Sequence, residues 1–272
     1  MKMGIDENAL KNDLYKVRHY AWGGDQNNSF DKHLVSRYVK VINKYDDLLN
    51  KQNEIADNAW NYVQTSWYNN WTSYLIESLF KHHKNVVSAV GEIKSVDFFL
   101  KDYPIDLKVT YFPNQYMDEK LKIKLGKKEL SWLKQKAKKL GVEVDNNQKV
   151  SQQLYVLSEK LSEIGAVEIL DELKSKRKEV VADAQSDVVE LMTWLYSNQG
   201  EMRFGAENRL FVVLVDTVDW EQSWKMKRAF ALIEPKVNYY LDNFNAESLK
   251  EVNFNFKGFK YKSLADVIFI VK

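Results

Sequence analysis

Two short apolar runs that meet at a tight turn constrain this chain more than any other feature. Both runs lie in VDFFLKDYPIDLKVT, residues 96–110, on either side of an Asp-Tyr-Pro turn. The pattern is typical of a half-buried β-hairpin, because successive residues of a strand point to opposite faces of a sheet. Charged side chains nevertheless stand inside both runs, where a strand normally presents Val, Ile or Phe.

The register of this hairpin decides which side chains share a face. We place the turn at residues 101–104 and pair Leu100 with Ile105, which sets Asp97 opposite Lys108. Alternation then sorts the side chains, and a slip of one residue would destroy the sorting. The polar face holds Asp97, Phe99, Asp106 and Lys108. The apolar face, which we expect to enter the core, holds Phe98, Leu100, Ile105 and Leu107.

The polar face of the hairpin suggests a hard-cation site. Two carboxylates a few ångströms apart repel each other unless positive charge lies between them. Lys108 places an ammonium group beside Asp97 and Asp106. Mg²⁺ prefers oxygen ligands and often takes one or two carboxylates, with water and substrate phosphate completing its shell. Such a metal would stabilise charge on a scissile phosphate, and the lysine could orient or help to deprotonate the attacking water.

A helix before the hairpin contributes a further acid. Residues 55–81 are predicted to form a long helix, along which apolar side chains step by three or four residues and make an aromatic stripe. Its members are Trp60, Val63, Trp67, Trp71 and Tyr74. Glu77 takes the next step, where the pattern predicts a hydrophobic residue.

Together these residues resemble the PD-(D/E)XK nuclease superfamily, to which many type II restriction endonucleases belong. The matching residues are the helix acid Glu77, the strand acid Asp97 and the triplet Asp106-Leu107-Lys108, within roughly residues 60–112. One departure is that Pro104 stands two places before Asp106 and not directly before Asp97. The resemblance implies an α/β fold of restriction-endonuclease type, in which a small mixed sheet is flanked by helices and carries a helical insertion.

The resemblance also implies a site and an activity. Asp97 and Asp106 would bind Mg²⁺ together with the backbone carbonyl of Leu107, and Lys108 would assist the water. Glu77 would support the metal directly or through a ligand water. The implied activity is Mg²⁺-dependent endonucleolytic hydrolysis of DNA, with restriction of foreign DNA as the expected role. Double-stranded DNA is the expected substrate and a homodimer the expected assembly.

The rest of the chain reads as one domain built around this core. We predict an N-terminal helical region over residues 1–54, a nuclease-like core over 55–117 and 199–272, and a helical insertion over 118–198. RLFVVLVD, residues 209–216, is short and rich in Val, which is typical of a buried parallel strand. A helix over residues 220–244 and a strand pair over 252–271 are expected to follow, and we interpret Asp266 in that pair as structural.

Two basic segments are candidates for DNA contacts. The lysine-dense stretch 118–139 could neutralise phosphates, although a solvated helix face explains it equally well. Its candidate contacts are Lys127, Lys128, Lys134 and Lys138. Arg203 and Arg209, in the loop before the buried strand, are candidates too, with structural salt bridges as the alternative.

The amino-acid composition narrows the classes of protein to which this chain could belong. The chain has no Cys, which excludes disulfides, zinc fingers and thiol catalysis. The formal net charge is only +2, so any basic surface must be local. With no apolar leader and no apolar stretch near the roughly 18 residues that span a bilayer, we expect a cytoplasmic protein without a membrane partner.

Two alternatives to a nuclease stay open. The first is a non-catalytic DNA-binding or protein-interaction protein that retains the nuclease fold. The second is a helical interaction protein in which Asp97 and Lys108 form only a surface ion pair across the hairpin. Divalent-dependent cleavage of plasmid would separate the nuclease from both, and DNA binding in EDTA would separate the two alternatives.

Overall fold

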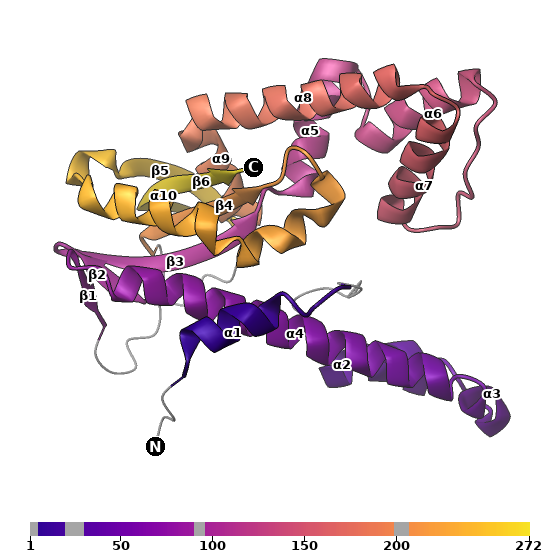
Figure 1. Ribbon diagram of the computed structural model, residues 1–272, viewed down its shortest axis with the longest axis horizontal. Helices are drawn as coiled ribbons and strands as arrows, with labels where there is room; N and C mark the ends of the chain where they lie inside the picture. The colour runs from indigo at the N-terminus through magenta and orange to yellow at the C-terminus, as the bar shows by residue number, and fades with distance from the viewer. Residues whose placement is uncertain (1–4, 20–29, 90–95, 199–206) are drawn as a thin grey trace. The chain divides into compact units, whose positions relative to one another are not determined.

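The computed structural model describes residues 5–19, 30–89, 96–198 and 207–272 (Figure 1). The chain divides into two compact units, residues 1–78 and 79–272, and each is described by itself. The predicted boundary at residue 54 falls inside a helix, because the long helix α4 starts at Gln52. Within the described part of the chain, no helix combines the length and the apolar character that a bilayer crossing requires.

The first unit is helical, as predicted. Its elements are α1 (Glu7–Leu14), α2 (Phe30–Leu34), the π-helix η1 (Val35–Val39), α3 (Tyr45–Leu49) and α4 (Gln52–Lys81), of which α4 continues into the second unit. Asp6 caps α1 by accepting hydrogen bonds from the N–H groups of Asn8 and Ala9, both at 3.0 Å. Such a cap satisfies N–H groups that the helix itself leaves without partners.

Most of the aromatic stripe of α4 is exposed. Trp60, Val63, Trp67 and Tyr74 are exposed. The buried residues of α4 are instead Thr65, Tyr68, Thr72, Leu75, Ile76, Ser78 and Phe80. The helical period was predicted correctly, but the contacts that α4 makes with other helices decide which face is covered.

The second unit contains a six-stranded mixed sheet, so the mixed α/β class is confirmed. Its strands lie in the order β1-β2-β3-β4-β6-β5. They are β1 (Val86–Ser88), β2 (Phe98–Leu100), β3 (Tyr103–Tyr111), β4 (Arg209–Val215), β5 (Lys250–Phe256) and β6 (Phe259–Val271). β4 is buried along its whole length and pairs in parallel with both β3 and β6, as predicted for RLFVVLVD.

The hairpin forms with a tighter turn than predicted. Leu100 pairs with Tyr103 and Phe98 with Ile105, so only Lys101 and Asp102 connect the strands. Lys101 adopts a φ of 53°, a conformation that two-residue hairpin turns require and that the sequence did not signal. The register is therefore shifted by two residues. Because the shift is even, the same side chains still share each face, but Asp97 no longer lies opposite Lys108.

Helices cover both faces of the sheet. One layer is α5 (Asn114–Leu125), α6 (Glu129–Lys139), α7 (Val150–Glu163), α8 (Val167–Ser186) and α9 (Val188–Asn198), and it accounts for the predicted helical insertion. Its buried side chains form one cluster with Phe211, Val213 and Ala265 of the sheet. Figure 1 shows α9 next to the strands, whereas α6 and α7 lie at the far end of α8.

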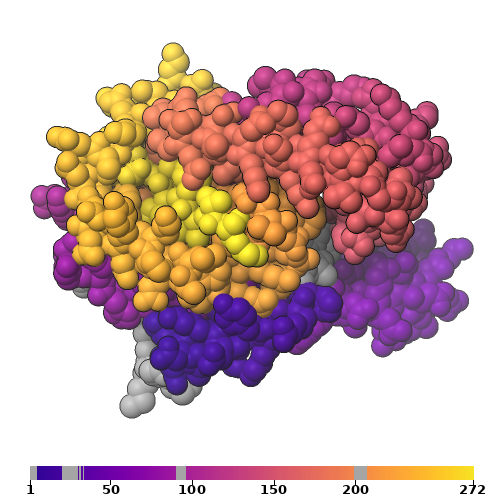
Figure 2. Space-filling model, turned by 45° about the horizontal axis from the view of Figure 1, so that its top comes forward, coloured from indigo at the N-terminus to yellow at the C-terminus, as the bar shows by residue number. Residues whose placement is uncertain are grey.

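The other face is covered by a second helical segment. It consists of the 3₁₀-helix η2 (Trp220–Arg228), α10 (Phe230–Asp242) and the short 3₁₀-turn η3 (Ala246–Ser248). In Figure 2 the C-terminal strands (yellow) are visible between this segment (orange) and the helices of the first layer (salmon). Helices therefore lie against both faces of the sheet.

Candidate active site

The predicted acid Asp106 lies on the face of the sheet that α9 covers. The parallel pairing of β3 with β4 places Asp106 beside Arg209, and Arg209 beside Ala265 of β6. The N–H group of Asp106 donates to the carbonyl oxygen of Asn208 at 2.9 Å. Neighbouring residues of a parallel ladder share a face, so these contacts point the Asp106 and Arg209 side chains to the same side.

Two cations hold the Asp106 carboxylate. Lys108 Nζ lies 2.7 Å from Oδ1, and Arg209 Nε lies 3.1 Å from Oδ2. The side chains of Asp106 and Arg209 are only 6 % and 2 % exposed, whereas that of Lys108 is 44 % exposed. The carboxylate is therefore an internal group whose one solvent-accessible partner is the lysine.

Asp97 meets the same strand from the other side, just before β2. Its N–H group donates to the carbonyl oxygen of Ile105 at 2.9 Å, and its Oδ2 accepts from the N–H group of Leu107 at 2.7 Å. The carboxylate thus takes the place of a strand in pairing with β3. The carbonyl of Leu107 leaves β3 on the same edge as its N–H group, which is the edge that Asp97 occupies.

A third carboxylate, Glu207, was missed by the sequence analysis. Its Oε2 lies 3.4 Å from Nη2 of Arg209, so Arg209 bridges Glu207 and Asp106. The hydroxyl groups of Tyr196 and Ser263 donate to the carbonyl oxygen of Glu207 at 2.8 and 2.6 Å, which fixes the segment that enters β4. The sequence offered one signal for Glu207, namely that it lies two residues before Arg209, the first residue of β4. This signal is weak unless the fold is known.

The cluster holds more negative than positive charge when all its groups are ionised. Asp97, Asp106 and Glu207 are acids, whereas Lys108 and Arg209 are the cations. Burial raises the pKa of Glu207, the nearby Asp106 carboxylate raises it further, and Arg209 offsets part of the change. A further cation close to these carboxylates would therefore be favoured by their electrostatics.

The carboxylates beside β3 can be compared with the ligand shell that Mg²⁺ requires. No group of three or more His, Asp or Glu side chains in the described part of the chain is arranged as a metal-holding set. Mg²⁺ does not need one, because it commonly uses one or two carboxylates and fills its other positions with water and substrate phosphate. Asp97, Asp106 and the Leu107 carbonyl could supply such a partial shell.

The structure gives a different outcome for each of three other predicted site residues. Glu77 belongs to the first unit and the carboxylate cluster to the second, so its role in the site stays a prediction. Arg203 lies outside the described residues. Arg209 is not presented to solvent as a DNA contact would be, because its guanidinium lies inside the protein between two acids and over the Tyr196 ring, 4.8 Å from its centroid.

The predicted phosphate-binding lysines are not equivalent. Lys127, Lys128 and Lys138 are exposed at the ends of α6, and no described acid pairs with them. Lys134 donates a hydrogen bond to Asn146 Oδ1 at 2.6 Å. Other lysines of the same helices have acidic partners: Lys124 with Asp183 and Lys136 with Glu172. Part of the stretch is thus a paired helix face, whereas Lys127, Lys128 and Lys138 carry charge without an acidic partner among the described residues.

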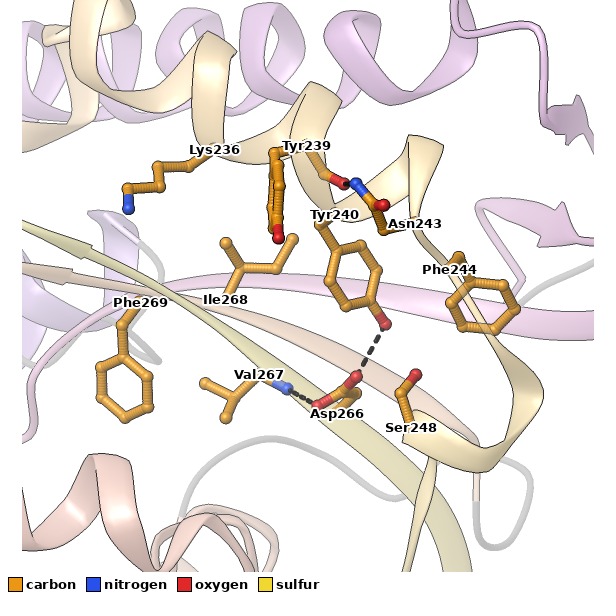
Figure 3. Close-up of a pocket in the computed structure, with 10 residues that line it drawn as sticks. All are labelled: Lys236, Tyr239, Tyr240, Asn243, Phe244, Ser248, Asp266, Val267, Ile268 and Phe269. Atoms are coloured by element: carbon orange, nitrogen blue, oxygen red, sulfur yellow. Dashed lines mark hydrogen bonds between the residues drawn. The ribbon is translucent and has the colours of Figure 1, made fainter.

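A second polar cluster lies on the opposite face of the sheet. Leu107, Leu210 and Asp266 are neighbours in register, so Asp266 faces away from Asp106 and toward α10. A cavity of about 400 Å³ lies there (Figure 3). Tyr240 donates to Asp266 Oδ2 at 3.0 Å and Val267 N–H to Oδ1 at 2.8 Å. Both carboxylate oxygens have partners, in keeping with a structural Asp266.

Comparison with protein-family models, with curated proteins and with solved structures found no match. The fold and the cluster define a mixed α/β protein in which a sheet hairpin presents a carboxylate–lysine group beside a buried arginine.

Proposed function

We propose that this protein is a Mg²⁺-dependent endonuclease that hydrolyses DNA phosphodiester bonds. One observation carries the proposal: the carboxylates of Asp97 and Asp106 flank the same segment of β3, and the Lys108 ammonium lies 2.7 Å from Asp106. A bound Mg²⁺ would act as a Lewis acid on the scissile phosphate. The PD-(D/E)XK resemblance of the triplet Asp106-Leu107-Lys108 supports the same assignment.

Each residue has a role in this proposal. Asp97, Asp106 and the Leu107 carbonyl hold the metal. Arg209 is a positioning residue, because it holds the Asp106 carboxylate from inside the protein. Lys108 is exposed enough to meet solvent and substrate, so its ammonium can orient the attacking water or accompany charge on the phosphate. Glu77 is proposed to support the metal.

DNA is the substrate that the surface favours. The exposed lysines Lys127, Lys128 and Lys138 can neutralise backbone phosphates independently of sequence. The proposed role is restriction of foreign double-stranded DNA in the cytoplasm. The absence of Cys accords with a reducing compartment.

A second candidate function has one specific observation in its favour. Both oxygens of Asp106 already accept charge-assisted hydrogen bonds, and Arg209 is almost fully buried. Such an arrangement is also what a structural ion-pair network would show. The second candidate is therefore a DNA-binding or protein-interaction protein with the same fold and no catalysis.

Incubation with supercoiled plasmid tests the proposal. Purified protein should nick or linearise the plasmid with Mg²⁺ or Mn²⁺, and EDTA should abolish the reaction. Ca²⁺ should support binding with little turnover, because its looser coordination positions the water poorly. Sequencing of the fragment ends then identifies the cut sites. Plasmid binding in EDTA with no cleavage under any divalent ion would favour the non-catalytic candidate, and cleavage in excess EDTA would contradict the metal site.

A further inference from the structure

The C-terminal part of β6 has an open edge. β5 begins at Lys250, which lies opposite Ala265, so β5 pairs with β6 only as far as Ala265. β6 continues to Val271, and over residues 266–271 its partner in the sheet is β4. Among the strands of the described residues, none lies beside this segment on the side away from β4. The segment therefore presents one edge that is not paired with a strand.

Backbone groups of the odd-numbered residues point out of this edge. The N–H group of Lys272 donates to the carbonyl oxygen of Val215 in β4 at 2.9 Å, so position 272 turns its backbone toward β4. Successive residues of a strand alternate in this respect. Val267, Phe269 and Val271 therefore turn their N–H and C=O groups away from β4, where an added strand would meet them.

Little protects this edge from pairing with another strand. Sheet edges are commonly blunted by charged residues, by Pro or by a bulge, yet every residue from Val267 to Val271 is apolar. Only the start of the segment is blocked, because Asp266 Oδ1 accepts the N–H group of Val267 at 2.8 Å. Figure 2 shows the C-terminal strand (bright yellow) at the surface between the orange segment and the salmon helices. An uncovered apolar edge is a surface to which an extended polypeptide can add by backbone pairing.

A cavity beside the edge can take a side chain of the added strand. It lies between β6 and α10, and its lining includes Val267, Ile268, Phe269 and Tyr239 (Figure 3). Directly opposite residues of an antiparallel pair point to the same face of the sheet. The residue opposite Ile268 would therefore point toward α10 and lie beside Tyr239, which is 71 % exposed. An aromatic side chain suits this place, because it can pack on Ile268 and against the Tyr239 ring.

Opposite charges mark the two ends of the cavity. Both carboxylate oxygens of Asp266 accept hydrogen bonds from neutral donors, and among the described residues no basic side chain pairs with this acid. Lys236 is exposed and likewise has no acidic partner in the described part of the chain. Figure 3 shows Lys236 on the side of Phe269, away from Asp266. A complementary strand would carry a basic residue opposite Asp266 and an acid opposite Ile270, within reach of Lys236.

We propose that the open edge of β6 binds an extended segment of another protein, which adds as an antiparallel strand with the pattern acid-x-aromatic-x-base. Antiparallel pairing is the more stable choice for a short strand. Backbone hydrogen bonds to Phe269 and Val271 supply affinity, whereas the cavity and the two charges supply specificity. The proposal does not depend on the nuclease activity, because Asp266 and Ile268 face away from Asp106. All of these groups belong to the second unit.

Other occupants fit this edge less well. Between Asp266 and Lys272 the strand has no basic residue, and Lys272 already pairs with Asp216 at 2.8 Å. The edge of a second copy of this chain would therefore offer Asp266 no free basic partner. Nucleic acid depends on Lys and Arg at its phosphates, which an apolar edge does not provide. A segment of a different protein, with its own acid and base, satisfies both ends.

Two peptides of the same composition test the order of the charges. The labelled peptide acetyl-TETFTKT-amide carries the pattern, and the full chain should bind it with a Kd on the order of 10 to 100 μM by fluorescence anisotropy. The reversed peptide acetyl-TKTFTET-amide places like charges against Asp266 and Lys236, so it should bind at least about tenfold more weakly. Absence of binding by the first peptide, or equal or tighter binding of the reversed one, overturns the proposal.

Methylation of single backbone amides tests whether the peptide binds as a strand. The two Thr residues that flank Phe would lie opposite Phe269 and Val267, so their N–H groups would point at β6. Methylation of both Thr amides should abolish binding, whereas methylation of the Phe amide, which points away, should change the Kd by no more than about twofold. Equal loss in both peptides would show that backbone pairing is not involved. Equally tight binding of acetyl-phenylalanine amide would show that the cavity alone binds, and either result overturns the proposal.

Substitution of Lys236 tests where the peptide lies. Lys236→Glu should weaken binding of acetyl-TETFTKT-amide by about tenfold, and acetyl-TKTFTKT-amide should recover most of the loss. Lys260→Glu is the matched control, because Lys260 is also exposed but lies in the part of β6 that pairs with β5. Circular dichroism checks that both variants are folded. Equal weakening in the two variants would assign binding to net charge, and self-association of the chain that the peptide reverses would assign the edge to a second copy. Both outcomes overturn the proposal.

Discussion

Arg209 and Asp106 form a buried ion pair that joins β4 to β3, with Nε 3.1 Å from Oδ2 and both side chains almost excluded from solvent. Removal of one partner from a buried pair leaves the other charge without compensation, which is costly. The arginine therefore has a structural task as well as its proposed positioning of the catalytic carboxylate.

Replacement of each cation beside Asp106 should separate these tasks. Arg209→Met should lower the free energy of unfolding by about 3 to 5 kcal/mol, because Asp106 and Glu207 are left buried together. Lys108→Met should cost about 1 kcal/mol or less, since Lys108 is nearly half exposed. Urea unfolding followed by circular dichroism measures both. Equal costs would contradict the picture of Arg209 as the internal partner and Lys108 as the accessible one.

Lys227 should make stability depend on pH in the alkaline range. Burial lowers its pKa to about 8, whereas an unfolded lysine has a pKa of about 10.4. Between these values the unfolded state binds more protons, so the free energy of unfolding should rise with pH. Lys227→Met should remove this rise and be more stable than wild type at pH 7, by up to roughly 3 kcal/mol.

The control for Lys227 lies on the same 3₁₀-helix. Lys225 is exposed, so Lys225→Met should leave the pH profile of the wild type unchanged. Unfolding in urea at several pH values from 7 to 10.5 gives the comparison. A wild-type profile that falls between pH 8 and 10, with Lys227→Met falling in parallel, would show that burial does not perturb this lysine.

The lysines at the ends of α6 that have no acidic partner among the described residues should account for the salt dependence of DNA binding. Joint replacement of Lys127, Lys128 and Lys138 by Gln should reduce the slope of log affinity against log salt by somewhat under one per phosphate contact, and leave sequence preference unchanged. Fluorescence anisotropy in EDTA measures the slope. The control replaces Lys124 and Lys136, which already have acidic partners. Equal changes in both sets would assign the binding to net charge alone.

Substitution of Glu77 distinguishes a role of this residue in metal binding from a purely structural role. If it supports the metal, Glu77→Gln should weaken the Mg²⁺ dependence of cleavage and leave the apo protein at least as stable as wild type, because like charges near a carboxylate cluster are unfavourable. Thermal melts with and without Mg²⁺, together with a metal titration of cleavage, measure the two effects. A destabilised variant with an unchanged Mg²⁺ requirement would remove Glu77 from the site.

Local patterns predicted the strands of the core, because burial and alternation act on neighbouring residues. The run from Leu210 to Val215 is buried and parallel as expected, and Phe98, Leu100 and Ile105 enter the core. The turn was placed wrongly because Lys101 adopts a positive φ. Two-residue turns of this kind are usually recognised by Gly or Asn, and neither residue occurs at this turn. Even so, the sorting of Asp106 and Lys108 onto one face was predicted, since a shift of two residues preserves faces.

Contacts between distant segments could not be predicted. Asp106 and Arg209 are neighbours only because β4 joins β3 after the whole helical layer has intervened. The sequence therefore suggested a DNA contact for Arg209, where the structure shows an internal ion pair, and it gave no reason to select Glu207. The stripe of α4 had the right period, but its exposure depends on where α1 and η1 pack.

Asp216 provides a matched control for the central claim. Like Asp106, it is a buried acid of the sheet region with a lysine partner, Lys272 Nζ at 2.8 Å. Burial alone would raise the pKa of Asp216, but hydrogen bonds from Lys272 and from the N–H groups of Asp219 and Val218 outweigh it and lower the pKa. Asp216 follows β4 at the end opposite Arg209, so it shares the physical setting of Asp106 without its neighbours.

The rate of Mg²⁺-dependent plasmid cleavage by wild type, Asp106→Asn and Asp216→Asn, each corrected for its folded fraction, tests the account most directly. Asp106→Asn should lower the rate by about a thousandfold or more, because it removes a proposed metal ligand and the partner of Lys108. Asp216→Asn should cleave at the wild-type rate, although it loses stability in the same way. Wild-type cleavage by folded Asp106→Asn, or equal loss of activity in both variants, would contradict the assignment of the active site to Asp106 and its neighbours.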